Sequence, residues 1–160
     1  MNDSNVVKYV LDTNILIKFS KWIPIEINTF FWKKMEEALF LRKWVLLDVV
    51  VDEVKREGLL FQWCKKQKEN SFLTKISDEN RNRAVVINSL YNMIDQSTGK
   101  SIVDTYIIAY AEENGLGVFS DEMFKAKDEN LNKIPDVCKQ LKIKNIRKPI
   151  KFLNNIGFRN

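Results

Sequence analysis

Residues 6–14 read VVKYVLDTN, an apolar run that ends abruptly in three polar residues. Residues 8–11 are short, rich in β-formers and apolar on both faces, which is typical of a buried strand in a parallel sheet. A helical pattern follows at once, and Thr13 or Asn14 is suited to cap that helix. In an open α/β sheet, ligands bind just outside the carboxyl ends of the strands. We therefore expect Asp12, at the tip of this strand, to face a site.

Segments with strand-like and helical patterns alternate along the rest of the chain. Further strands are expected at 44–47, 72–76, 118–120 and 143–146. Helices are expected at 27–42, with an apolar stripe that starts at Ile27 and Phe30, and at 49–58, 59–68, 105–114, 135–141 and 149–156. Another helix should be capped by Asp78 and carry an apolar face of Val85, Val86, Leu90, Met93 and Ile94. This alternation predicts a single α/β domain over residues 1–160, with a central, mostly parallel sheet.

The composition is that of a globular chain that can bury a core. Of the 160 residues, 45% are hydrophobic and 29% are charged. No apolar run approaches the roughly 20 residues that span a bilayer, and the first residues, MNDSN, lack the basic and apolar parts of a signal peptide. Cys64 and Cys138 lie far apart and form no CxxC motif. We therefore expect a reduced, cytoplasmic protein without a membrane segment.

The titratable residues limit the kinds of catalysis and the partners that the chain can have. The chain has no histidine, which excludes Ser-His-Asp and Cys-His catalysis and His-ligated zinc. The net charge of +5 mildly favours an anionic partner. Residues 142–160 contain six bases and no acid, and this segment is interpreted equally well as a solvated tail or as a surface that contacts phosphates.

Four positions remote in sequence carry acids that the predicted topology brings together. Asp12 and the pair Asp121-Glu122 follow strands, and Glu53 and Asp104 lie near the starts of helices. Because the carboxyl ends of parallel strands and the following helix N-termini share one edge of a sheet, these carboxylates are expected to converge. Such a cluster would be self-repulsive unless it bound a hard divalent cation such as Mg²⁺. A metal-activated water could then attack a phosphodiester.

Each acid alone also has a purely structural interpretation. The chain has 21 acids, and most acids in proteins are solvated charges or helix caps. Glu53 has acidic neighbours at positions 52 and 57, as on a solvated surface. Asp104 lies in the first turn of a predicted helix, where the dipole favours an anion. Asp12 is the strongest candidate, because an acid that directly follows a buried strand must find a partner.

Several motifs in order resemble the PIN-domain nuclease family, including the VapC-type toxins of bacterial toxin–antitoxin pairs. The resemblance covers nearly the whole chain. It is carried by YVLDTN at 9–14, DEVKREG at 52–58, DTYIIAYA at 104–111 and VFSDE at 118–122. The closing IPDVC at 134–138 is similar to a less-characterised subgroup of that family. Val103 is a minor departure, since a small residue is common there in the family.

The resemblance implies a three-layer α/β/α sandwich and an endoribonuclease that depends on Mg²⁺ or Mn²⁺. It assigns the catalytic site to Asp12, Glu53, Asp104 and a fourth acid, with Asp12, Asp104 and Glu122 as metal ligands. The family pattern selects Glu122 as the fourth acid, and Asp121 is its immediate neighbour. Asn14 and Ser120 resemble residues that support the first and fourth acids. The resemblance also implies an antitoxin partner and a homodimer.

Basic residues are the natural contacts for an RNA backbone. The candidates are Lys55, Arg56, Lys125, Lys148 and Lys151. Two alternatives stay open at this stage. The chain could be a non-catalytic module that binds RNA or protein, or a metal-dependent DNA nuclease or phosphatase that uses the same acids.

Overall fold

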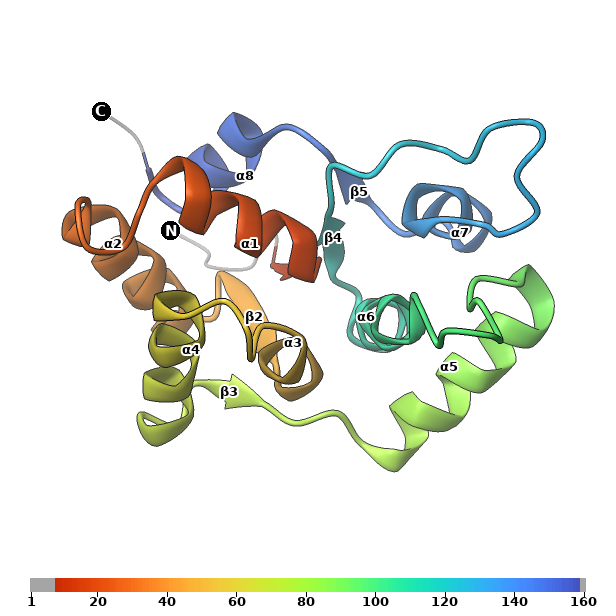
Figure 1. Cartoon of the computed structure of the whole chain (residues 1–160), viewed down its shortest axis with the longest axis horizontal. Helices are drawn as coiled ribbons and strands as arrows, with labels where there is room; N and C mark the ends of the chain where they lie inside the picture. Colours follow the sequence, from red (N-terminus) through yellow and green to blue (C-terminus); the bar gives the residue numbers. More distant parts are fainter. Residues whose placement is uncertain (1–7, 159–160) are drawn as a thin grey trace.

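A computed structural model describes residues 8–158, in which five parallel strands form one sheet in the order β3-β2-β1-β4-β5. Figure 1 shows this sheet between helices. The strands are β1 (Tyr9–Leu11), β2 (Trp44–Leu47), β3 (Leu73–Thr74), β4 (Gly117–Phe119) and β5 (Asn145–Ile146). The helices are α1 (Thr13–Trp22), α2 (Thr29–Phe40), α3 (Asp48–Glu53), α4 (Leu59–Glu69), α5 (Asp78–Tyr91), α6 (Ile102–Asn114), α7 (Ile134–Leu141) and α8 (Pro149–Asn155). The predicted α/β class, parallel sheet and three-layer sandwich are confirmed.

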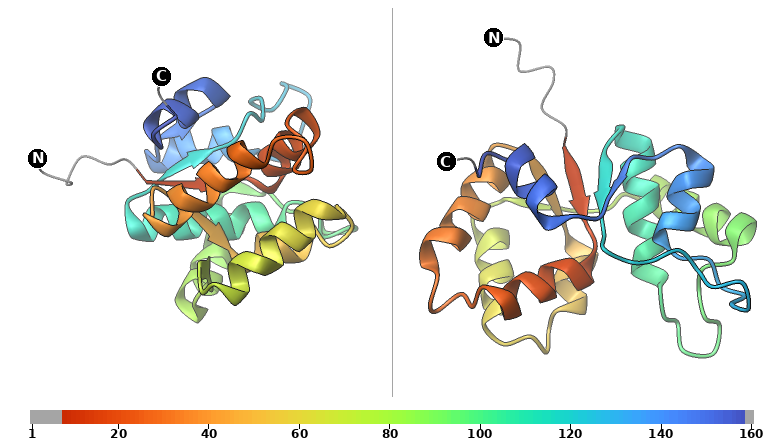
Figure 2. Two further views of the ribbon diagram at one scale, coloured as in Figure 1. Left: turned by 90° about the vertical axis from the view of Figure 1, so that its left-hand side faces the viewer. Right: turned by 90° about the horizontal axis from the view of Figure 1, so that it is seen from above.

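Helices cover both faces of the two central strands, β1 and β4 (Figures 1 and 2). On one face, Phe19 of α1 and Phe152 of α8 pack on Phe119 of β4, with ring centroids 5.9 Å and 4.7 Å from the Phe119 ring. On the other face α6 packs against both strands, and α5 packs against α6. Aromatic packing of this kind buries a large apolar area.

The register of the central strands places their tips level with one another. Val10 pairs with Val118, and Leu11 pairs with Phe119. The next backbone group along, the N–H of Asp12, donates to the Phe119 carbonyl at 2.9 Å. Gly117 starts β4 without a side chain, because a Cβ there would lie 2.8 Å from the buried Tyr9 ring. The carboxyl ends of β1 and β4 therefore form one edge, on which Asp12 and Ser120 are neighbours.

Two predicted apolar faces are partly wrong, although Met93 of the first is buried as predicted. In α5, Val85 and Leu90 are 69% and 63% exposed and Val86 is also exposed, whereas Ala84 and Ile87 are buried. The helix packs on α6 rather than on the sheet, and polar side chains take part in that contact, so hydrophobic residues do not mark its inner side. In the second case Ile27 precedes α2 and both Ile27 and Phe30 are exposed, although the rest of that stripe is buried.

The ends of several elements also differ from the prediction. Asp12 itself, not Thr13 or Asn14, is the N-cap of α1. Ser77 rather than Asp78 caps α5 and forms a capping box with Asn80. The helix predicted at 49–58 ends at Glu53, and the chain continues in turns to the left-handed Gly58. The predicted strands at 72–76 and 143–146 are each only two residues long.

None of the helices within residues 8–158 is long and apolar enough to cross a bilayer. Cys64 and Cys138 are free and buried. Burial raises the pKa of each thiol to about 12, so neither thiol is an activated nucleophile.

Candidate functional site

Asp12 is a buried carboxylate held in place by its neighbours on the sheet edge. Only 2% of its surface is exposed. Its Oδ2 accepts a hydrogen bond from the Ser120 hydroxyl at 2.9 Å, and its Oδ1 accepts one from the Asn14 backbone N–H at 3.3 Å. Burial nevertheless raises the pKa of Asp12, and the nearby charge of Asp121 raises it further, because two hydrogen bonds only partly replace water.

Asp104 lies in the first turn of α6, three residues after the left-handed Ser101 at the N-cap of the helix. Burial raises the pKa of Asp104 to about 8, and the negative charges of Asp12, Glu122 and Glu53 contribute to that rise. A hydrogen bond from Ser101 acts in the opposite direction. Four carboxylates from four separate parts of the chain therefore interact at this one place, with Asp104 among them.

Glu53 and Glu122 complete the group, and each is fixed by one hydrogen bond. The Thr13 hydroxyl donates to Oε1 of Glu53 at the end of α3. The backbone N–H of Ile134, which starts α7, donates to Oε2 of Glu122 at 3.1 Å. Desolvation raises the pKa of both glutamates, and the charge of Asp12 raises it further. Both side chains thus face the same acidic centre from opposite sides of β1.

Asp121 has a different environment from its neighbour Glu122. Its Oδ2 forms an ion pair with the Lys18 ammonium group of α1, and its side chain is about one-quarter exposed. Lys18 and Asp121 lie together on the rim of an open hollow of about 420 Å³. The hollow is also lined by Asp12, Asn14, Lys21 and Glu122, so it gives solvent access to the acidic centre. Of the two candidates for a fourth acid, Glu122 is the one whose charge raises the pKa of Asp104.

The donor set fits a hard cation in its chemistry. All four side chains offer carboxylate oxygens, the ligands that Mg²⁺ and Mn²⁺ prefer. Within residues 8–158, no group of three or more acidic or cysteine side chains is close enough to enclose a metal ion. Mg²⁺ usually takes one or two protein carboxylates and keeps several waters, so a tight cage of three is not needed. Asp12 and Asp104 are the two acids that a cation between β1 and α6 would use.

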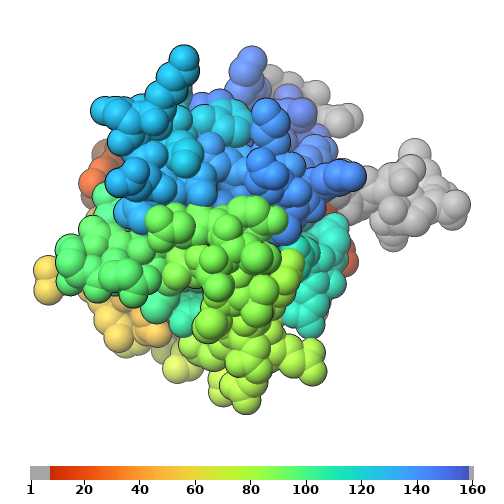
Figure 3. Space-filling view, turned by 90° about the vertical axis from the view of Figure 1, so that its right-hand side faces the viewer, coloured from red at the N-terminus to blue at the C-terminus, as the bar shows by residue number. Residues whose placement is uncertain are grey.

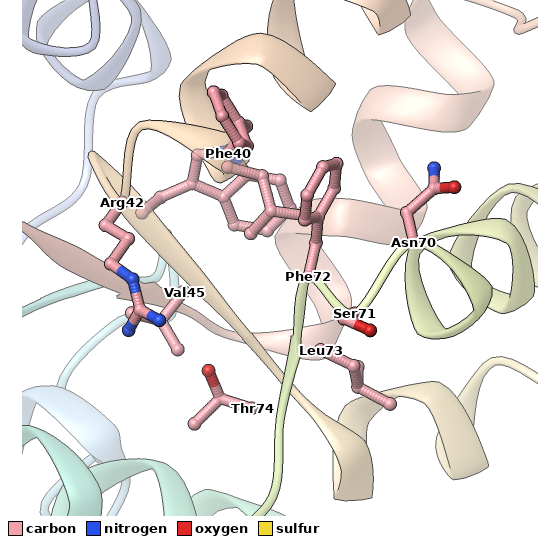
Figure 4. Close-up of a pocket in the computed structure, with 10 residues that line it drawn as sticks. Phe40, Arg42, Val45, Asn70, Ser71, Phe72, Leu73 and Thr74 are labelled. Carbon is pink, nitrogen blue, oxygen red and sulfur yellow. The ribbon is translucent and has the colours of Figure 1, made fainter.

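A second hollow, of about 300 Å³, lies where β2 and β3 diverge (Figure 4). Arg42 is the charged residue among those that line it, beside Phe40, Phe72 and Thr74. The ring centroids of Phe40 and Phe72 are 5.4 Å apart. Because no acid lines this hollow, it offers no ligand set for a hard cation, and it is separate from the acidic centre.

The supporting and basic residues expected from the sequence have mixed positions. Ser120 binds Asp12 as expected, whereas Asn14 reaches it through the backbone. Lys55 is exposed and pairs with Asp52 at 3.3 Å, so its charge is partly compensated. Arg56, Lys148 and Lys151 are exposed. Lys125 is half-buried and lines a hollow beside Phe124.

Sequence reasoning missed three side chains that contact these acids. Thr13 binds Glu53, Lys18 binds Asp121, and Ser101 binds Asp104. The position of Lys18 near the acids could have been predicted from the sequence, because it lies four residues after Asn14 and therefore on the same side of α1. The other two side chains are adjacent to a predicted acid or three residues before one, but no spacing rule distinguishes them from ordinary polar residues.

A family model described as a domain of unknown function (DUF4411) matches residues 9–159. The chain belongs to the DUF4411 family. Comparisons with curated proteins and with solved structures found no match. The matched residues of this DUF4411 domain include all four converging acids.

Substitutions of the adjacent acids Asp121 and Glu122 test which of them belongs to the acidic centre of the DUF4411 domain. If a metal-dependent activity resides here, Glu122→Gln should lower it by about 10²-fold, because a charge that faces Asp104 is lost. Asp121→Asn should lower it less than about tenfold, since Asp121 is already neutralised by Lys18. Initial rates of RNA cleavage under matched conditions measure both effects. A larger loss with Asp121→Asn would place the fourth acid at Asp121.

Proposed function

We propose that this DUF4411 protein is a metal-dependent endoribonuclease of the PIN type. The observation that supports the proposal most is the convergence of four carboxylates, remote in sequence, with the pKa of Asp104 raised to about 8. Holding such a cluster without a cation costs stability, since like charges repel in a poorly solvated place. Acids whose pKa is strongly raised by burial and by neighbouring charges belong to functional sites more often than ordinary surface acids do.

Each residue of the centre would have a distinct task. Asp12 and Asp104 would hold Mg²⁺ or Mn²⁺ between the strand tip and α6, with Glu122 beside them. The Ser120 hydroxyl fixes the orientation of Asp12, and the Thr13 hydroxyl fixes that of Glu53. When bound, the cation would lower the pKa of a coordinated water and neutralise charge on the phosphate. Glu53, at the end of α3, would accept a proton from the attacking water.

The open hollow beside Asp12 supports a polymeric phosphate substrate. Lys21 lines it together with the acids and with the Lys18–Asp121 ion pair, so Lys21 is a cation for a phosphate backbone next to the site that would bind the metal. The net charge of +5 favours the same class of partner. By the same resemblance, we propose that the protein is the toxin of a toxin–antitoxin pair, with an antitoxin partner, a homodimeric form and a cytoplasmic location.

Metal-dependent cleavage of a mixed RNA pool tests this proposal. Wild-type protein should cut RNA with Mg²⁺ or Mn²⁺ and leave it intact with EDTA, because the acids alone repel phosphate. Single-stranded DNA of the same sequences and p-nitrophenyl phosphate serve as substrates for the alternatives. Cleavage of DNA alone would favour a DNA nuclease, and release of p-nitrophenol would favour a phosphatase. RNA left uncut under every condition, with no metal-dependent change in melting temperature, would contradict the proposal.

A further inference from the structure

An exposed aromatic side chain lies on the loop that leaves the acidic centre. Phe124 comes two residues after Glu122, so their Cα atoms are at most about 7 Å apart. Its side chain is 49% exposed, and the adjacent Met123 is 68% exposed. In Figure 3, the segment after β4 (cyan to blue) lies above α5 (green). The ring is thus presented to solvent beside the candidate site rather than packed in the core.

Two cations lie close to the Phe124 ring. The Lys139 ammonium group of α7 is 5.9 Å from the ring centroid, and the Arg147 guanidinium after β5 is 6.0 Å from it. Among the described residues, neither cation has a carboxylate oxygen within 4.0 Å. Arg147 also lies close to the acids along the backbone, because the Ser120 N–H donates to the carbonyl of Ile146 at 3.1 Å.

A hollow of about 370 Å³ adjoins the ring, a volume within the range that holds a small ligand. Phe124, Tyr91, Lys125 and Lys139 line it. Asp136 is also in its wall, but one carboxylate oxygen accepts the backbone N–H groups of Lys125 and Lys133 at 3.1 Å and 2.8 Å. The surface therefore combines a partly exposed aromatic ring with two cations over it, Lys139 and Arg147, that have no ion-pair partner among the described residues.

We propose that Phe124 is a stacking platform for an unpaired RNA base next to the cleaved phosphate, with Lys139 and Arg147 on the flanking backbone. This inference rests on the proposed nuclease function and adds a residue outside the acidic centre that would position the substrate. Aromatic faces next to basic side chains are the usual means by which proteins hold single strands. In a duplex the base faces are covered by their neighbours, so a paired substrate cannot use the ring.

Binding of a short single-stranded RNA that carries 2-aminopurine tests the platform. All variants carry Asp104→Asn, so that RNA is not cut, and the buffer contains Mg²⁺. Phe124→Ala should weaken binding about tenfold and abolish the quenching of 2-aminopurine fluorescence that stacking causes. Phe124→Trp should retain both. Phe30→Ala is the matched control, because Phe30 is similarly exposed and has a cation, Lys34, 5.7 Å from its ring, on another part of the surface.

The results separate the platform from the proposed function. The platform is overturned if Phe124→Ala binds the single strand as tightly as its parent, or if a blunt RNA duplex loses as much affinity as the single strand. Failure of the Asp104→Asn parent to bind single-stranded RNA also overturns it. The nuclease proposal is judged separately, by whether the wild-type protein cuts RNA with metal. Cutting that is unchanged by Phe124→Ala therefore refutes the platform alone.

Discussion

Asp104→Asn is expected to reduce metal-dependent RNA cleavage by a factor on the order of 10³ or more. Asp104 is the carboxylate on which the charges of Asp12, Glu122 and Glu53 all act. Its replacement by the isosteric amide removes one of the two acids assigned to the cation and keeps the first turn of α6 intact. Initial rates at saturating Mg²⁺, with thermal melting to show that the variant is folded, measure the effect.

Asp95→Asn provides the matched control for that loss. Asp95 is a half-exposed acid in the loop before α6, and its carboxylate accepts hydrogen bonds from Ser97. Its substitution removes the same charge from the chain as Asp104→Asn does. Because Asp95 is not one of the four acids of the centre, the cleavage rate should stay within about twofold of wild type. Equal activity of the Asp104→Asn variant and the wild type would rule out this carboxylate centre as the catalytic site.

The metal-free protein is expected to lose stability as the pH rises from about 4 to about 8. The pKa of Asp104 is about 8 in the fold and near 3.8 in the unfolded chain. Over this interval the folded state keeps a proton that the unfolded state releases, so the free energy of unfolding falls as pH increases. The free energy of unfolding falls by about 1.4 kcal/mol for each pH unit in that interval, and the total loss reaches several kcal/mol.

Thermal melting in EDTA at pH 5 and pH 8.5 measures this dependence. We expect the melting temperature of the wild type to be about 10 °C lower at the higher pH. Asp104→Asn should flatten the difference, because an amide does not titrate. Mg²⁺ should restore much of the lost stability at pH 8.5, since it binds only the folded carboxylates. A wild-type profile parallel to that of Asp104→Asn would show that Asp104 does not carry a buried proton.

Local sequence patterns were sufficient to predict the sheet and the positions of its acids. A strand that is buried on both faces reads as an uninterrupted apolar run, as in residues 9–11, and the residue after such a run lies at the ligand-binding edge. This rule identified Asp12 and the pair Asp121-Glu122 before any contact was known. The choice between those two neighbours required the structure, since only the fold turns Asp121 toward Lys18 and Glu122 toward Asp104.

The inner side of α5 was not predictable in the same way. Its contact with α6 includes a hydrogen bond from Asn80 to Glu113 and an ion pair between Arg83 and Glu112. Because charged and amide groups form part of this contact, the apolar residues that remain lie largely on the exposed side. Pairs such as Thr13 with Glu53, 40 residues apart, and Lys18 with Asp121, 103 residues apart, have no local pattern at all.

The position of Asp12 at the N-cap of α1 affects which mutations the fold can tolerate at this residue. Its Oδ1 accepts the backbone N–H of Asn14, and its Oδ2 accepts the Ser120 hydroxyl. An asparagine keeps one oxygen for the capping bond to Asn14 and offers an amide N–H to Ser120, whose hydroxyl can accept it. A codon for Asp becomes a codon for Asn by one base change, and that change removes the charge but keeps the cap. If the proposed activity resides at this centre, a folded copy that lacks it is therefore a single nucleotide change away.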